Sequence, residues 1–243
     1  MTGIGYREQP ATLPGAVRWT NVLRSGAVAR VLPDGCLDLV RSPGGQLLVA
    51  GPDRAAQLVP GAPGAVWVGL RLPPGLGPAV LGVPALELLD RRVPLAALWG
   101  DARAGLLERR LAGSSAVEAT ALLDAVARRR LSGADGGGPS GRVRPDPAML
   151  RLVHLLRSGQ RVDRAAAEVG MGERQVHRRS LVAFGYGPKT LARILRLGRA
   201  LDLARSGVPP AQVAADAGFA DQPHLAREVR ALAGVPLRRL LTG

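Results

Sequence analysis

The chain has 243 residues, enough for two domains that each bury a core. It carries 33 Lys+Arg against 19 Asp+Glu, a net charge of +14. Residues 1–133 hold 15 Arg and 10 acidic residues, whereas residues 134–243 hold 18 Arg and Lys and 9 acidic residues, so the shorter part is the more basic. A single cysteine, Cys36, excludes internal disulfides. The first ten residues lack a basic-then-apolar pattern, and proline and glycine interrupt the longest uncharged run, so we expect no signal peptide, no membrane span and a cytoplasmic protein.

The N-terminal part predicts short strands followed by helices. Strands are expected at 16–23, 27–32, 37–41, 46–50 and 65–71, because turn sequences rich in Pro, Gly and Asp separate these stretches. Beyond Pro78 the apolar period becomes helical, and helices are expected at 84–90, 94–99, 101–111 and 115–131. On the last helix, one side is expected to face the core: Val117, Ala121, Leu122, Ala125 and Val126. These patterns indicate a small antiparallel sheet or partial barrel with trailing helices.

The stretch PDGCLD places Asp34, Cys36 and Asp38 close together. Two interpretations stand: a metal or nucleophile cluster, or a Pro-Asp-Gly turn into a strand where Cys36 packs as a small apolar side chain. The second is favoured because no His or Lys flanks the thiol to lower its pKa. The three histidines, His154, His177 and His224, all follow residue 133, which excludes a histidine-based metal site in the N-terminal part. We therefore expect no cofactor, no metal and no enzymatic activity.

A glycine-rich stretch, SGADGGGPSGRVR, begins at Ser132 and predicts a linker. It divides the chain into a domain at 1–131, a linker at 132–145 and a domain at 146–243. The second domain opens with an expected helix at 147–157. On that helix the side chains expected toward the core are Leu150, Val153, His154, Leu155 and Leu156.

Residues 212–229, QVAADAGFADQPHLAREV, predict two short helices that meet at Gly218. Small residues before the glycine allow a second helix to cross closely, Gly218 suits a turn with positive φ, and Phe219 fills the corner. Residues 163–181, DRAAAEVGMGERQVHRRSL, repeat this pattern when Gly170 is set on Gly218. After the turn the offset grows by one, so that Val176 matches Leu225. Two helix-turn-helix units are therefore predicted.

A helix at 188–206 is expected to join the two units, starting with a proline at its first position. Its core-facing stripe is expected to be Leu191, Ile194, Leu195, Gly198 and Leu201. A helix of this length spans about 28 Å, close to the ~34 Å turn of B-DNA. Both units can therefore reach the same side of one duplex.

The paired units resemble the DNA-binding domain of AraC/XylS-type bacterial transcription regulators. The resemblance covers about residues 148–241 and rests on AADAGFADQPHLAREVRALAGVP and HRRSLVAFGYGPKTLARILRLGRAL. The family usually has Phe where Leu225 and Val229 stand. Upstream, VLPDGCLDLV, LLVAGPDR, VGLRLPPG and RRVPLAALWG resemble an uncharacterised domain found in front of this kind of DNA-binding domain.

The resemblance implies an α+β chain with an N-terminal antiparallel β domain, trailing helices and an all-α double helix-turn-helix domain of seven helices. Double-stranded DNA is the implied partner, and the N-terminal domain is implied to sense a small-molecule effector or to mediate homodimerisation. RNA polymerase is a further candidate partner, and no membrane is. The remaining alternative is a small-molecule-binding protein or enzyme with a degenerate DNA-binding half. Affinity for its own upstream DNA with a steep salt dependence would separate the two.

The second helix of each unit, the reading helix, carries the candidate DNA-binding side chains. In the first unit Val176 and Leu181 are expected inside, and the exposed candidates are Arg174, Gln175, His177 and Arg178. Arginine pairs with guanine and glutamine with adenine in the major groove. In the second unit, where Leu225, Val229 and Leu232 are expected inside, the candidates are Gln222, His224 and Arg227. For His224, capping or bracing the helix is as open as DNA contact.

Overall fold

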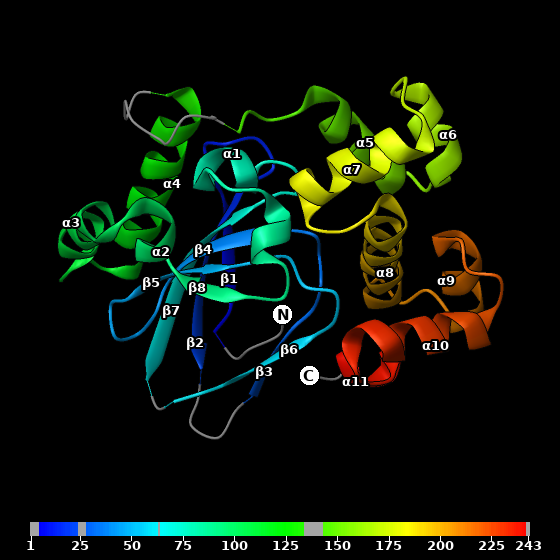
Figure 1. Ribbon diagram of the computed structural model, residues 1–243. Helices are drawn as coiled ribbons and strands as arrows, with labels where there is room; N and C mark the ends of the chain where they lie inside the picture. Colours follow the sequence, from blue (N-terminus) through cyan, green and yellow to red (C-terminus); the bar gives the residue numbers. More distant parts are fainter. Residues whose placement is uncertain (1–4, 24–27, 63, 134–142, 242–243) are drawn as a thin grey trace.

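The computed structural model describes residues 5–23, 28–62, 64–133 and 143–241 (Figure 1). Its N-terminal half contains a six-stranded antiparallel sheet in the order β1-β2-β7-β4-β5-β8 and a separate pair, β3-β6. The strands are β1 (Arg7–Pro10), β2 (Val17–Leu23), β3 (Val28–Val31), β4 (Leu37–Arg41), β5 (Leu47–Ala50), β6 (Gln57–Pro60), β7 (Ala65–Leu72) and β8 (Arg92–Pro94). The five predicted strands are confirmed. Three strands were not predicted, β1, β6 and β8, because each is only three or four residues long and ends in or contains proline.

The helical elements of this half are α1 (Gly77–Leu81), the 3-10 turn η1 (Ala85–Leu88), α2 (Ala96–Trp99), α3 (Asp101–Leu111) and α4 (Ala116–Ser132). Helix α4 starts with a capping box, in which the Ser115 hydroxyl accepts from the Glu118 amide and the Glu118 carboxylate accepts from the Ser115 amide. It packs against β2 and β7.

The predicted buried face of α4 is only partly confirmed, because Leu122 and Val126 are half-buried and pack against the core whereas Val117 and Ala121 are exposed. Val117 is 63% exposed, and the side turned to the sheet carries Ala119, Leu123 and Ala127 together with buried Thr120 and Asp124. Asp124 is tolerated inside because its carboxylate accepts hydrogen bonds from both the amide and the hydroxyl of Thr12, each at 2.8 Å. The predicted apolar stripe therefore lies at the edge of the buried face, where Leu122 and Val126 still contact the core, and extends into solvent at Val117 and Ala121.

The C-terminal half is built from seven helices in the part of the chain that the structure describes, which confirms the predicted all-α unit. They are α5 (Pro147–Arg157), α6 (Val162–Glu168), α7 (Glu173–Phe184), α8 (Pro188–Arg205), α9 (Pro210–Ala217), α10 (Gln222–Ala233) and α11 (Leu237–Leu241). No helix among the described residues has the length and hydropathy needed to cross a membrane.

Four predicted core positions of the helical half are wrong. On α5, Leu150 is 38% exposed and His154 is exposed, whereas Met149 and Leu152 are fully buried. On α7, Leu181 is only half-buried. Gly198 of α8 is exposed, because that turn of the helix borders a cleft toward the N-terminal half instead of the core.

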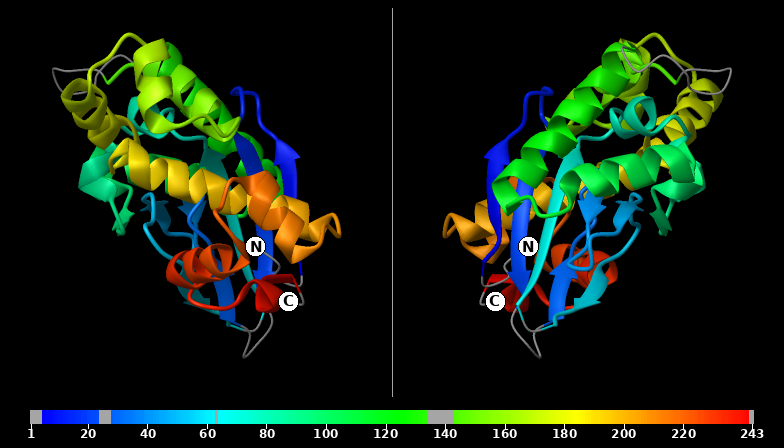
Figure 2. Two further views of the ribbon diagram at one scale, coloured as in Figure 1. Left: turned by 90° about the vertical axis from the view of Figure 1, so that its right-hand side faces the viewer. Right: turned by 90° about the vertical axis from the view of Figure 1, so that its left-hand side faces the viewer.

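Each half has its own cluster of buried apolar side chains, and the halves are docked on each other. Figure 2 shows the C-terminal helices lying against one side of the N-terminal half. The loop after α7 meets η1 closely: a Cβ placed on Gly185, where φ is +83°, would lie 3.1 Å from the carbonyl oxygen of Ala85. Leu32 and Leu89 of the N-terminal half pack on the helical core. The predicted linker falls largely on residues 134–142, outside the described residues.

Candidate nucleic-acid interface

The two helix-turn-helix corners have the same backbone geometry. Gly170 and Gly218 both adopt positive φ, +69° and +82°, a conformation that side chains resist. The amide of the residue after each glycine, Met171 or Phe219, donates to the carbonyl of the alanine five residues earlier, at 3.0 and 2.8 Å. Both of these residues are buried. The predicted alignment of the two units is therefore confirmed.

The first reading helix, α7, exposes its N-terminal half. Val176 points into the core, and the exposed side chains are the predicted set, Arg174, Gln175, His177 and Arg178. Within the described residues Arg174 and Arg178 have no ion-pair partner, whereas Arg179 is held by Asp146 at the start of α5 (Nε to Oδ2, 2.6 Å). Arginines that are not used internally remain free to bind an anion or a base edge.

A groove of about 1290 Å³ runs beside this helix, bordered by α6, α7 and the start of α8. Arg174 and His177 line it from α7, and Lys189 lines it from α8. The His177 ring lies over Gly187, where an added Cβ would come within 2.9 Å of Nδ1. Arg178 instead borders a smaller hollow of about 220 Å³, shared with Gly75 and Pro78. Arg174 and His177 therefore stand at the centre of the exposed face and Arg178 at its edge.

The second reading helix, α10, is braced at its start by His224. Asp221 caps the helix by accepting from the His224 amide at 2.6 Å, and His224 Nδ1 accepts from the Ala220 amide at 3.2 Å. The imidazole also packs edge-on against Phe219, with 5.4 Å between ring centroids. The structure thus shows a bracing role for His224, and its contact with DNA stays a prediction. Gln222 and Arg227 are exposed, and Leu225, Val229 and Leu232 are buried as predicted.

Helix α8 fixes the separation and orientation of the two units. Its 18 residues span about 27 Å. Arg199 donates to the carbonyl oxygens of Arg157 in α5 and Ala217 in α9, both at 3.0 Å. Arg193 pairs with Glu228 of α10 through two contacts of 2.8 and 3.0 Å. These hydrogen bonds lower the pKa of the Glu228 carboxyl below its usual value.

The N-terminal half holds the C-terminal ends of both reading helices, a feature that the sequence analysis missed. At α10, Arg30 Nη1 donates to the carbonyl of Ala233 at 2.8 Å, and the amide of Ala56 donates to the carbonyl of Leu232 at 2.7 Å. At α7, the helix itself and Gly185 directly after it pack on η1. Helix C-termini carry unpaired carbonyl groups, so donors placed there are stabilising. No local signal near Arg30 or Ala56 indicates these long-range contacts.

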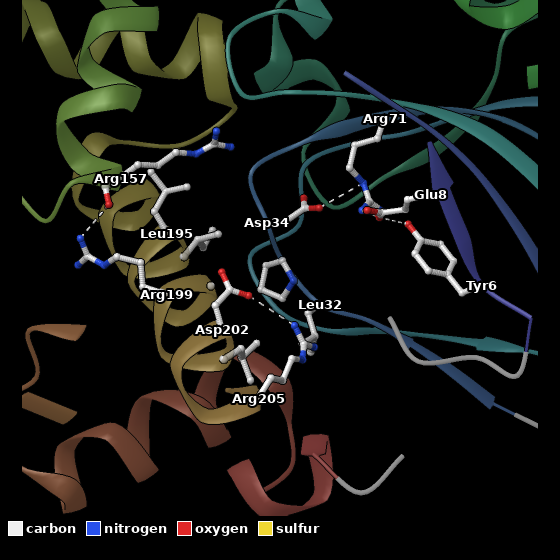
Figure 3. Close-up of a pocket in the computed structure, with 14 residues that line it drawn as sticks. Tyr6, Glu8, Leu32, Asp34, Arg71, Arg157, Leu195, Arg199, Asp202 and Arg205 are labelled. Carbon is white, nitrogen blue, oxygen red and sulfur yellow. Dashed lines mark hydrogen bonds and ion pairs between the residues drawn. The ribbon is translucent and has the colours of Figure 1, made fainter. Parts of the chain in front are cut away.

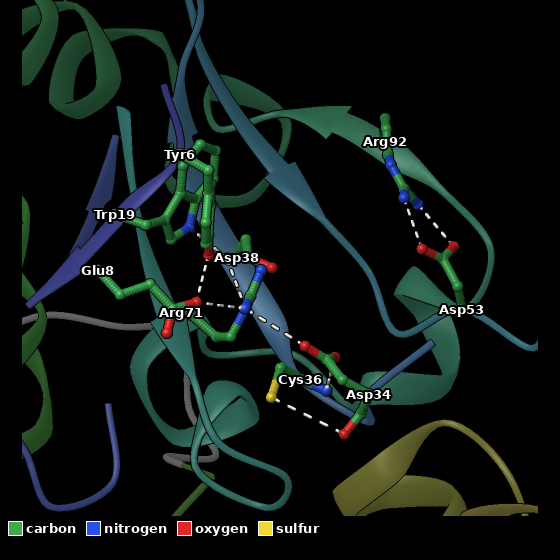
Figure 4. A network of polar contacts seen from close by, with 9 residues as sticks. All are labelled: Tyr6, Glu8, Trp19, Asp34, Cys36, Asp38, Asp53, Arg71 and Arg92. Atoms are coloured by element: carbon green, nitrogen blue, oxygen red, sulfur yellow. Dashed lines mark hydrogen bonds and ion pairs between the residues drawn. The ribbon is translucent and has the colours of Figure 1, made fainter. Parts of the chain in front are cut away.

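A network of polar side chains around Arg71 lies in the N-terminal half (Figure 4). The Arg71 guanidinium approaches three carboxylates, those of Glu8 (3.2 Å), Asp34 (3.3 Å) and Asp38 (3.4 Å). The Asp34 side chain also accepts from the amide of Cys36 at 2.9 Å, which forms the turn expected from Pro-Asp-Gly. Burial raises the pKa of the Cys36 thiol. Among the described residues no three His, Cys, Asp or Glu side chains are grouped to hold a metal ion.

Two family models match the chain. A helix-turn-helix domain covers residues 149–242, and a domain of unknown function, DUF6597, covers residues 16–94. The fold is similar to the crystal structure of apo ToxT K231A from Vibrio cholerae strain SCE256, with a TM-score of 0.51, 13% identity, and coverage of 97% of this chain and 99% of that one. ToxT from Vibrio cholerae O395 matches with a TM-score of 0.49, 12% identity, and coverage of 93% and 97%. No curated protein matches.

The doubled corner, the spacer helix and the helix-turn-helix match define a DNA-binding protein with two reading helices. More particularly, the C-terminal half carries an AraC-type helix-turn-helix domain, and the β-rich half in front of it matches a domain of unknown function.

Proposed function

We propose that this regulator reads its operator with the N-terminal halves of α7 and α10 and that its N-terminal domain adjusts them in response to a small-molecule effector. One observation carries the proposal: both reading helices are held at their C-terminal ends by the N-terminal half and exposed at their N-terminal ends. Recognition helices of this kind contact bases with their N-terminal residues. An effector that shifts the N-terminal half can therefore change the placement of both helices.

The two units contribute unequally in this proposal. The first supplies the base-reading side chains, with Arg174 and Arg178 as donors to guanine and Gln175 as a partner for adenine, and His177 lies beside them. The second has fewer exposed donors, so Gln222 and Arg227 mainly position it on the backbone while His224 keeps the helix start in shape. The first unit then determines most of the preference for particular DNA base pairs.

The domain limits and remaining partners are part of the proposal. We place a sensing domain at 1–131 and the DNA-binding domain at 146–243, each with its own core cluster to support it. A second copy of the chain and RNA polymerase are proposed as protein partners. The protein is proposed to be non-enzymatic and to act in the cytoplasm, where a bacterial regulator meets its DNA.

The test is DNA binding by full-length protein, first through a selection of bound sequences and then by fluorescence anisotropy. Arg174→Ala and Arg178→Ala are compared with Arg128→Ala, an exposed arginine on α4 far from the reading helices. A base-reading arginine should lose about 1–3 kcal/mol, or roughly 5–150-fold, at sites that contain its base pair and should relax the preference there. An equal loss on all sequences, with a smaller salt dependence, would assign the residue to phosphate contact instead.

A further inference from the structure

A cleft of about 560 Å³ lies between the two halves, where the β sheet faces α8 (Figure 3). Its size is within the range of small-molecule sites. Residues of the β1 region and of the turn before β4 line one side, and the end of α5 and one face of α8 line the other. Gly198 opens onto it, with no atom within 4 Å of the position that a Cβ would take. Among the described residues, no side chain of either half fills the cleft.

The side of the cleft formed by the sheet is acidic. Arg71 is its one basic group, and the carboxylates of Glu8, Asp34 and Asp38 surround it. Of these groups, the carboxylates of Glu8 and Asp34 and the guanidinium of Arg71 line the cleft, so this side has one more acidic than basic group. Glu8 and Asp34 line the cleft with side chains that are 45% and 44% exposed, so each keeps oxygen lone pairs open to a ligand. This side is suited to an ammonium group.

The side formed by the helices is basic. Arg157, Arg199 and Arg205 line it against a single acid, Asp202. Arg199 is engaged with two backbone carbonyl groups and Arg205 lies 3.7 Å from Asp202, whereas Arg157 has no ion-pair partner among the described residues. Figure 3 shows the Arg157 side chain extending from α5 toward the N-terminal half. A free guanidinium at this position is suited to a carboxylate.

Aliphatic side chains also line the cleft: Leu32 from the N-terminal half, and Ile194, Leu195 and Leu201 from α8 beside its arginines. From this arrangement we infer that the cleft binds an α-amino acid with an apolar side chain. Its ammonium group binds Asp34 and Glu8, its carboxylate binds Arg157, and its side chain contacts the aliphatic surface. A ligand with only one charge satisfies one side and leaves the other without a counter-charge, which gives the site its selectivity for a zwitterion.

The position of the cleft links occupancy to DNA binding, and this consequence rests on the proposed function. Because the two sides belong to different halves, a bridging ligand stabilises the docked arrangement. In that arrangement the N-terminal half holds the C-terminal ends of α7 and α10. By linkage, the bound amino acid changes the affinity for operator DNA, and DNA changes the affinity for the amino acid by the same factor.

The experiment is isothermal titration calorimetry on the full-length chain without DNA. The probes are Ala, Val, Leu, Ile, Met and Phe, followed by the deaminated and decarboxylated analogues of the tightest binder; for Leu these are 4-methylpentanoate and 3-methylbutylamine. The variants are Arg157→Gln, whose side chain has no internal partner, and Asp34→Asn, which keeps the oxygen that accepts from Cys36. Arg128→Gln is the matched control for loss of one exposed arginine.

We expect at least one amino acid to bind and both single-charge analogues to bind at least tenfold more weakly. Arg157→Gln and Asp34→Asn should each weaken binding about tenfold or more, and Arg128→Gln should leave it unchanged. The inference is overturned if none of the six amino acids binds, if the carboxylate analogue binds as tightly as the amino acid, or if Arg157→Gln has no effect. Operator binding by the ligand-free protein is measured separately, so failure of the ligand site and failure of DNA recognition are distinguishable.

Discussion

The glycine at the corner of the second helix-turn-helix unit gives a prediction about stability. Replacing it with alanine should destabilise the protein, whereas the same replacement at a second glycine should stabilise it. Gly218 ends α9 with φ +82° and ψ +37°, and no atom lies within 4 Å of where a Cβ would be. Gly218→Ala therefore introduces backbone strain without a clash. A left-handed conformation costs a non-glycine residue about 1–2 kcal/mol. Gly218→Val should cost more, because branching at Cβ restricts the backbone further.

Gly198 is the matched control, since a Cβ added there would also have no atom within 4 Å, but this glycine sits inside the regular helix α8. Alanine there reduces the entropy of the unfolded chain and should stabilise the helical half by about 0.5–1 kcal/mol. The two variants should thus differ by about 1.5–3 kcal/mol.

Urea denaturation of the ligand-free proteins, followed by circular dichroism, measures both changes. Thermal melting should show the same order, with a shift of about 4–8 °C for each kcal/mol in a unit of this size. If Gly218→Ala is as stable as the wild type, or if both substitutions change stability in the same direction, the corner does not require the positive φ and the reasoning fails.

Three further predictions concern the contacts between elements. The fragment 142–243 should fold alone, because it contains the helical core cluster, and should bind the same DNA sequence more weakly than the full chain in anisotropy titrations; an unfolded fragment would mean that the halves share one core. Arg30→Ala, which removes the donor to Ala233, should weaken operator binding several-fold and increase tolerance of a changed half-site spacing, whereas unchanged spacing preference would show that this contact does not orient α10. Glu228 has a pKa lowered by its hydrogen bonds from Arg193, so its stabilisation is present above about pH 4.5 and is lost as pH falls through the lower, folded-state pKa; Glu228→Gln should remove up to about 1 kcal/mol at pH 7 and flatten the acid limb, and parallel wild-type and variant curves would refute this.

The features that depend on neighbours in the chain could be predicted from the amino-acid sequence. The bounds of the helices at 101–111 and 147–157 follow from the apolar period, and the structure has the same bounds. Gly170 and Gly218 were identifiable because a tight turn between two short helices needs positive φ. The exposure of Arg174 and Arg227 followed from the buried positions of Val176 and Leu225, since a helix fixes which side chains lie opposite each other.

Which face of a helix is buried depends on long-range contacts when polar and apolar residues compete for that face. Asp124 is inside because Thr12, 112 residues away, supplies two hydrogen bonds, and no local pattern encodes that partner. Gly198 is exposed because α8 faces a cleft as well as a core. The donors from Arg30 and Ala56 to the end of α10, and the opposite charges across the cleft, likewise join segments distant in sequence. Such contacts arise from the docking of two separately built halves, so their residues can be identified only once the halves are placed together.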